Sequence, residues 1–435
     1  MGNADPSGLR SRRDFISSTV AALAGLTVAP NTIPYPDNFS GNENIFGTIT
    51  HEPGKSIIGQ YGPWAASLAG DPPLLSFRHS SWKDLETWRS QALNKAMDCI
   101  ASPSIEPDPD VETLEKFEFD GLTIERLQWK LPYGRPTEAI LLKPADAHGP
   151  LPAILGFHDH GGNKYFGKRK MTRTGKAGHP LIEEHQEQYY GSRAWANEIA
   201  KRGYVVLVHD AFTFGSRRVM YQDVAGISWG FNSTEGRSDD DPEKPENIRK
   251  YNEWAGHHEH IMAKSLFCAG TTWPGVFLAE DQYALNILCS REDVDAERVG
   301  CAGLSGGGLR TVYLSGMDQR IKCAVAIGFM STWRDFLINK SYTHTWMTYI
   351  PLLPKYLDFP EVMGLRVPLP TMIQNCIEDP LYTMPEVNRA NQILSEIYAK
   401  AGAPECYQFN LYDGGHKFDE EMQNDAFVWF DKWLK

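Results

Sequence analysis

The feature that most constrains the fold is a series of short, largely apolar runs that begins at residue 151. The runs lie at 151–157, 204–208, 298–304, 321–329, 369–377 and 407–412. Each run is followed by a longer stretch of sequence, and most of these stretches show helical periodicity. Continuous apolarity is typical of parallel strands that are buried on both faces of a sheet. The intervening helices then serve as crossover connections. The pattern predicts a doubly wound α/β domain, with a mostly parallel sheet and flanking helices, over residues 115–435.

Three strand-like runs precede this pattern, at residues 113–119, 121–131 and 136–143. The turn residues at 133–137 predict a hairpin between the last two runs. The segment 216–265 is too long to be a simple connection between two elements of the domain, and it contains a charged stretch with prolines. It is interpreted as a cap-like insertion near the C-terminal edge of the sheet.

The first 114 residues are interpreted as lying outside the α/β domain. Residues 30–114 are expected to form an irregular arm and one helix, at 81–100, that pack on the core. Residues 1–29 contain Arg12 and Arg13 followed by an apolar stretch that ends in small residues. This layout is typical of a secretory signal, and the arginine pair resembles a twin-arginine export signal. The alternative is a basic, amphipathic first helix.

The export signal predicts a partner and a location for the protein. The partner is the twin-arginine export machinery, and the location is periplasmic or extracellular, with a membrane anchor if the signal stays uncleaved. The formal net charge of −12 argues against a nucleic-acid partner, which requires a basic surface. The sequence leaves the oligomeric state open.

The strongest functional signal is the segment RVGCAGLSGGG at 298–308. It places Ser305 in a G-x-S-x-G motif between an apolar run and a helical pattern. A serine on such a strand-to-helix turn projects its hydroxyl away from the sheet, and the flanking glycines allow close backbone approach. The helix N-terminus favours developing negative charge. The context predicts that Ser305 is a nucleophile.

A nucleophilic serine requires a base and an acid that orients the base. His416 lies in a glycine-bearing loop after the last apolar run and is the predicted base; His344 is the other histidine downstream of Ser305. Asp379 follows the preceding run and is the predicted acid, with Glu378 as the alternative.

The oxyanion of an acyl-transfer reaction requires two backbone N–H donors. The residue after the nucleophile, Gly306, supplies one. The segment HDHGG at 158–162 follows an earlier apolar run, and the second donor is expected from His160 or Gly161. Two metal interpretations compete, one on HDHGG and one on HHEH at 257–260. Neither has an established ligand pattern, so no metal and no cofactor are predicted.

These motifs together resemble the α/β-hydrolase family, in particular its dienelactone-hydrolase and acetyl-xylan-esterase-like branches. The resemblance covers about 115–435 and rests on the segments HDHGG, VHDAFTFGSRR, DAERVGCAGLSGGG, SGMDQRIKCAVAIGF, NCIEDPLYT and YDGGHKF. It implies the α/β-hydrolase fold, with Ser305 as nucleophile, Asp379 as acid and His416 as base. Asp159 departs from the pattern, because many relatives carry glycine there. Ser305 also departs from it, because true dienelactone hydrolases use cysteine.

The predicted function is that of a carboxylic ester hydrolase that acts through an acyl-enzyme on a carbohydrate or small acyl ester. The alternatives are a serine peptidase of the prolyl-oligopeptidase type and a non-catalytic binding protein with the same fold. Trp273 and Trp333 are the candidate substrate contacts, with packing as the alternative role for each.

Overall fold

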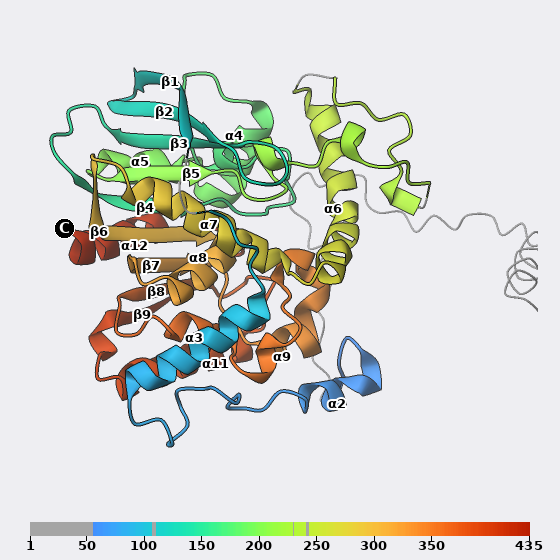
Figure 1. Cartoon of the computed structure of the whole chain (residues 1–435), viewed down its shortest axis with the longest axis vertical. Helices are drawn as coiled ribbons and strands as arrows, with labels where there is room; N and C mark the ends of the chain where they lie inside the picture. The colour runs from blue at the N-terminus through green and yellow to red at the C-terminus, as the bar shows by residue number, and fades with distance from the viewer. Residues whose placement is uncertain (1–54, 107–109, 229, 241–242) are drawn as a thin grey trace, which may run out of the picture. The chain divides into compact units, whose positions relative to one another are not determined.

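The computed structural model describes residues 55–435, except 107–109, 229 and 241–242 (Figure 1). The predicted export signal at 1–29 and the first part of the arm lie outside the described residues. Within the described part of the chain, none of the helices has the length and apolar character needed to cross a membrane.

Nine strands form one sheet, in the order β1-β2-β3-β5-β4-β6-β7-β8-β9. Their bounds are β1 Val111–Phe119, β2 Leu122–Trp129, β3 Thr137–Pro144, β4 Leu151–Phe157, β5 Val205–His209, β6 Val294–Leu304, β7 Ile321–Ile327, β8 Thr371–Cys376 and β9 Tyr407–Tyr412. The first three strands pair in antiparallel fashion, and β3 joins β5 in the same way. All pairs among β4 to β9 are parallel. The predicted mostly parallel sheet and the β2–β3 hairpin are therefore confirmed.

Helices cover both faces of the sheet (Figure 1). Their bounds are α2 Gly62–Ala66, α3 Leu85–Ile100, α4 Pro180–Tyr190, α5 Trp195–Lys201, α6 Pro245–Cys268, α7 Trp273–Cys289, α8 Gly306–Met317, α9 Trp333–Asp335, α10 Phe359–Gly364, α11 Met384–Lys400 and α12 Glu420–Leu434. Along β4, Leu155 belongs to an apolar cluster that includes residues of α3, α7, α8 and α11, whereas its neighbour Ile154 belongs to another that includes residues of α4, α5 and α12. Because successive side chains point to opposite faces, a strand covered on both sides is apolar throughout.

The helix expected at 81–100 begins later, at Leu85. Asp84 is its N-cap, because the Asp84 carboxylate accepts a hydrogen bond from the backbone N–H of Thr87. Ser81 therefore lies before the helix and not at its cap. The indole N–H of Trp88 donates to the carbonyl oxygen of Leu75 over 2.7 Å, which ties the preceding segment to the helix.

The segment interpreted as an insertion contains short turns followed by the 24-residue helix α6, which ends at Cys268. Trp254 and Tyr251 of α6 are buried against Tyr165, Val219 and Tyr221. The insertion therefore forms a small apolar cluster that also includes Tyr165 of the loop after β4.

The topology brings the functional loops to one edge of the sheet. Because β4 to β9 are parallel, their carboxyl ends lie along the same edge, and in doubly wound sheets ligands bind outside this edge. The loops that follow these strands carry Asp159, Ser305, Gly328, Asp379 and His416.

Candidate active site

Ser305 occupies a sharp turn between β6 and α8. Its φ of 60° and ψ of −116° lie in a region that L-residues rarely adopt, and its backbone N–H donates to the carbonyl oxygen of Ile327 over 2.8 Å. A side chain at Gly303 would come within 2.5 Å of the carbonyl oxygen of Phe157, and one at Gly307 would overlap the same atom. The motif glycines therefore allow the strand, the turn and the helix to pack closely, as the nucleophile elbow requires.

His416 and Asp379 are paired. Nδ1 of His416 lies 2.6 Å from Oδ2 of Asp379, and Oδ1 of the same carboxylate accepts the backbone N–H of Leu381. Burial disfavours the charged imidazolium, but the Asp379 carboxylate outweighs this effect and raises the pKa of His416 above 6.5. The side chain of the alternative acid, Glu378, is exposed. The structure thus places Asp379, and not Glu378, on His416.

The loop of His416 and the turn of Ser305 meet at the end of β7. Ser305 bonds to Ile327, and a side chain at the next residue, Gly328, would lie 2.9 Å from Cε1 of His416. With Nδ1 held by Asp379, Nε2 is the remaining ring nitrogen, and it is buried without a hydrogen-bond partner among the described residues. This is the atom that a general base presents to a serine hydroxyl.

His344 has a different environment from His416. Its Nε2 lies 3.0 Å from the carbonyl oxygen of Leu381, and its ring contacts Phe336 and Tyr382. Burial lowers the pKa of His344 to about 4. It is a neutral pocket residue with no carboxylate to orient it as a base.

The backbone of the β4 loop faces the turn of the nucleophile. A side chain at Gly306 would lie 3.3 Å from the backbone nitrogen of His160, and this N–H has no hydrogen-bond partner among the described residues. Gly161 instead adopts a positive φ of 48° and packs against the side chains of Asp159 and His185. Of the two expected donors, the structure places His160 beside Gly306.

A network of buried hydrogen bonds fixes the position of this loop. The Asp159 carboxylate accepts the hydroxyl of Tyr190 over 2.6 Å and lies 3.1 Å from Nε2 of His185. The ammonium of Lys170 donates to the carbonyl oxygens of Asp159 and His160 over 2.7 and 2.9 Å. Burial would raise the pKa of Asp159, but His185 and Lys170 hold it well below its ordinary value. The Asp159 carboxylate therefore fixes the position of this loop.

Sequence reasoning did not single out Lys170, His185 or Tyr190. The departure at Asp159 was the available signal, since a carboxylate in a buried loop requires partners.

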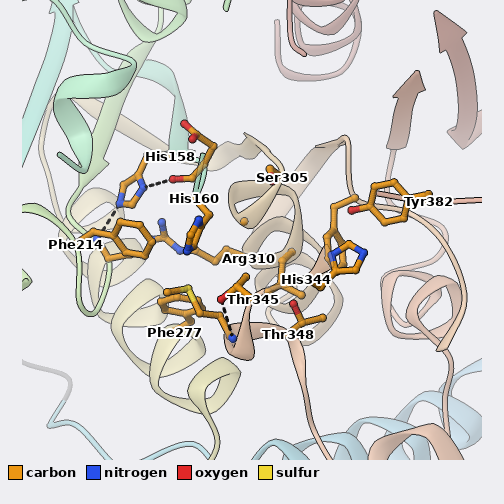
Figure 2. A pocket seen from close by; sticks show the side chains of 16 residues that line it. His158, His160, Phe214, Phe277, Ser305, Arg310, His344, Thr345, Thr348 and Tyr382 are labelled. Carbon is orange, nitrogen blue, oxygen red and sulfur yellow. Dashed lines mark hydrogen bonds between the residues drawn. The ribbon is translucent and has the colours of Figure 1, made fainter. Parts of the chain in front are cut away.

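A small pocket opens beside Ser305 (Figure 2). Its volume is about 30 Å³, and its lining residues are His158, Asp159, His160, Ala211, Phe214, Phe277, Ser305, Gly306, Leu309, Arg310, Phe329, His344, Thr345, Met347, Thr348 and Tyr382. Neither predicted substrate contact is among them. Trp273 is buried beside Phe277, and Trp333 stacks on Phe359 at a centroid distance of 3.8 Å. Both tryptophans pack in the core.

The helix α6 contributes a buried carboxylate, Glu259, that contacts two lining residues of the pocket, His160 and Thr345. Oε1 of Glu259 lies 2.7 Å from Nε2 of His160 and 3.1 Å from the ammonium of Lys164. Its other oxygen accepts the hydroxyl of Thr345 over 2.7 Å. Burial would raise the pKa of Glu259, but the Lys164 charge and the His160 hydrogen bond lower it.

The two segments considered as metal sites use their polar atoms in other contacts. In HHEH, Glu259 binds His160, His257 stacks on Phe231 and His258 stacks on Trp254. In HDHGG, Nδ1 of His158 pairs with the carbonyl oxygen of Asp159, and Nε2 accepts the backbone N–H of Ala211. Over residues 55–435, leaving aside the gaps given above, no group of three or more potential ligands converges.

The fold and the loop order define an α/β-hydrolase-fold protein. No family model matches the chain. A protein of Bacillus subtilis (strain 168) that is provisionally named as a hydrolase, YtaP, is 25% identical over 327 residues, which cover 74% of this chain and 92% of that protein.

Solved structures agree with this assignment of the fold. A protein of Bacteroides fragilis NCTC 9343, provisionally assigned as an acetyl xylan esterase, is 17% identical with a TM-score of 0.59, over 83% of this chain and 84% of that one. A glucuronoyl esterase from Solibacter usitatus is 14% identical with a TM-score of 0.53, over 80% of this chain and 94% of that one. At these identities the likeness concerns the fold.

Proposed function

We propose that this protein is a carboxylic ester hydrolase that forms an acyl-enzyme on Ser305. The pairing of His416 with Asp379 over 2.6 Å, in loops that converge on the strained turn of Ser305, carries this proposal. The name of the Bacillus subtilis relative and those of the structural neighbours support a hydrolase.

In the proposed mechanism, His416 takes the proton of the Ser305 hydroxyl while the oxygen attacks the ester carbonyl. Asp379 holds the imidazole through Nδ1 and stabilises the imidazolium that forms. The backbone N–H groups of His160 and Gly306 stabilise the oxyanion. His416 then protonates the leaving alcohol and activates the water that hydrolyses the acyl-enzyme.

The size of the pocket supports a small acyl group. A volume of about 30 Å³ accommodates a group a few atoms in size, because one water requires roughly 10–15 Å³ on the same measure. Its walls include Phe214, Phe277, Leu309 and Met347, which suit a short apolar tail. Since the structural neighbours are named for esters of xylan and glucuronic acid, we propose a short acyl ester of a carbohydrate as the substrate.

Labelling with a fluorophosphonate tests the nucleophile directly. We expect a covalent adduct on Ser305, and we expect Ser305→Ala to lose the adduct together with hydrolysis of 4-nitrophenyl acetate. Hydrolysis by the alanine variant at the rate of the parent protein would refute the mechanism. A protein that neither reacts nor hydrolyses esters or peptides would be a binding protein, and cleavage of prolyl peptides in preference to esters would indicate a peptidase.

We also propose that residues 1–29 direct export through the twin-arginine pathway. The arginine pair at 12 and 13 and the following apolar stretch support this proposal. Cell fractionation of a strain expressing the full chain tests it. The Arg12→Lys, Arg13→Lys variant is expected to accumulate in the cytoplasm, and unchanged fractionation would refute the proposal.

A further inference from the structure

Arg310 is the one charged residue of helix α8 and lies in the wall of the pocket. Its relative exposure is 2%. Nε donates to Oδ2 of Asp281 over 3.0 Å, and the guanidinium lies over the rings of Phe157 and Phe277, at 4.4 and 5.6 Å from their centroids. These contacts hold the group rigidly.

One nitrogen of this guanidinium, Nη1, remains unused. It is buried and has no hydrogen-bond partner among the described residues, whereas Nε and Nη2 both bind Asp281. Figure 2 shows the side chain reaching from the helix toward His160 and Phe214, in the pocket that Ser305 faces. Buried N–H groups without a partner are rare and costly. An acceptor atom of a bound molecule would supply the missing hydrogen-bond partner of Nη1.

The charges around the pocket indicate what kind of acceptor fits. Arg310 lines the pocket, and two further buried cations, Lys164 and Lys170, lie against its lining residue Phe214. Each cation already faces a buried carboxylate: Arg310 faces Asp281, Lys170 faces Asp159, and Lys164 faces Glu259. A carboxylate on the ligand would therefore be a buried charge without a counter-ion, which is strongly unfavourable. An uncharged oxygen, such as that of a hydroxyl group, satisfies the N–H without this penalty.

A second polar atom points to the same chemistry. Nε2 of His344 donates to the carbonyl oxygen of Leu381, which leaves Nδ1 as a lone-pair acceptor. None of the hydrogen bonds among the described residues involves this Nδ1, and His344 lines the pocket on the side away from the Arg310 guanidinium (Figure 2). Besides the groups of the proposed mechanism, the pocket thus presents a donor at Arg310 and an acceptor at His344. Hydroxyl groups can meet both, because they accept and donate.

We infer that the pocket selects esters that carry an uncharged hydroxyl group close to the scissile bond, with Nη1 of Arg310 as the donor that recognises it. This inference rests on the proposed esterase function and narrows its substrate class. The hydroxyl belongs either to the acyl group or to the alcohol, and both place the same chemistry beside Ser305.

Matched ester pairs test the inference. On the acyl side, 4-nitrophenyl hydroxyacetate is compared with 4-nitrophenyl propionate, which has a methyl group in place of the hydroxyl. On the alcohol side, 2-hydroxyethyl acetate is compared with propyl acetate. Each kcat/KM is divided by the hydroxide-catalysed rate constant of the same ester, so that intrinsic reactivity cancels.

We expect a preference of about 10-fold or more for the hydroxylated ester in one of the two pairs, since a hydrogen bond from a charged donor contributes roughly 1.5–3 kcal/mol. The ester pair that shows the preference identifies whether the recognised hydroxyl group belongs to the acyl group or to the alcohol. In Arg310→Lys, which keeps a positive charge beside Asp281, the preference should fall to less than about 3-fold. The ratio of the two kcat/KM values does not depend on the fraction of active protein, so it can be compared between variants even if one of them is partly misfolded.

The double variant Arg310→Met, Asp281→Asn removes both charges together and replaces the lysine variant if the latter does not fold. Equal or inverted selectivity in the parent protein, or a preference that survives loss of the guanidinium, would overturn the inference while leaving the esterase function intact. Failure to hydrolyse any of the four esters, together with failure of Ser305 to react with a fluorophosphonate, would instead overturn the proposed function.

Discussion

Oε1 of Glu259 lies 2.7 Å from Nε2 of His160, so helix α6 of the insertion holds a residue of the loop that faces the nucleophile. The two residues are 99 positions apart in the chain. The backbone N–H of Gly162 donates to Nδ1 of His160, which leaves Nε2 as the donor to Glu259. The insertion is therefore part of the proposed catalytic machinery.

Glu259→Gln is expected to lower kcat for 4-nitrophenyl acetate by roughly 10- to 100-fold with a smaller effect on KM, since the donor of the oxyanion hole is misplaced. Steady-state kinetics measure the split. Glu253→Gln, at an exposed position of the same helix, is the matched control and should leave kcat unchanged. Equal losses in the two variants would show that Glu259 has no special role.

Asp379→Asn is expected to lower kcat by about 10³- to 10⁴-fold, because the imidazole loses its orienting carboxylate. Glu378→Gln, at the exposed neighbour, should change kcat by less than about 2-fold. The two variants differ by one position, and a larger loss in Glu378→Gln would assign the acid to Glu378.

Activity should fall as the pH falls through the raised pKa of His416, because the base must be neutral to accept the proton. The acidic limb of the kcat/KM profile is therefore expected above pH 6.5. In Asp379→Asn, His416 stays buried but loses the carboxylate that raises its pKa. His416 should therefore stay neutral, and the residual activity should persist, down to a lower pH. An acidic limb at the same pH in both proteins would contradict the assignment.

Tyr190→Phe removes the hydroxyl that donates to Asp159 over 2.6 Å. We expect a loss of about 1–3 kcal/mol in the free energy of unfolding, the cost of leaving a buried carboxylate with fewer donors. Tyr189→Phe is the control, because the ring of Tyr189 contacts His416 and its hydroxyl makes no hydrogen bond among the described side chains. Chemical denaturation should separate the two variants.

Gly307→Ala would place a methyl group on the carbonyl oxygen of Phe157. We expect a destabilisation of about 3 kcal/mol or more, because neither backbone segment can move away. Gly256→Ala is the contrasting case, since nothing lies near that position on α6. It should stabilise the protein by roughly 0.5–1 kcal/mol through helix propensity. Thermal unfolding of both variants would check the contrast.

The sheet could be read from the sequence because burial on both faces leaves a continuous apolar run. The run at 151–157 coincides with β4 and that at 204–208 nearly coincides with β5, and both strands are buried along almost their whole length. The predicted strand at 407–412 coincides with β9 at the edge of the sheet, where polar residues alternate with apolar ones. Ser305, Asp379 and His416 could be predicted as a group for a related reason. In a parallel sheet every loop after a strand lies at one edge, so chain order alone brings these three residues to the same place.

The contacts of the polar residues on helices were decided by the tertiary structure alone. Glu259 lies in the HHEH segment, whose local pattern also fits a metal site, and Arg310 lies in an otherwise uncharged helix. Glu259 contacts His160, and Arg310 contacts Asp281. The two residues of each pair are far apart in the chain, so no local sequence pattern predicts the contact. The sequence by itself determined the sheet and the order of its loops, because these follow from periodic burial. Only the folded chain decided which charges pair around the pocket and which buried N–H has no protein partner, because this depends on the distances between side chains of different helices and loops.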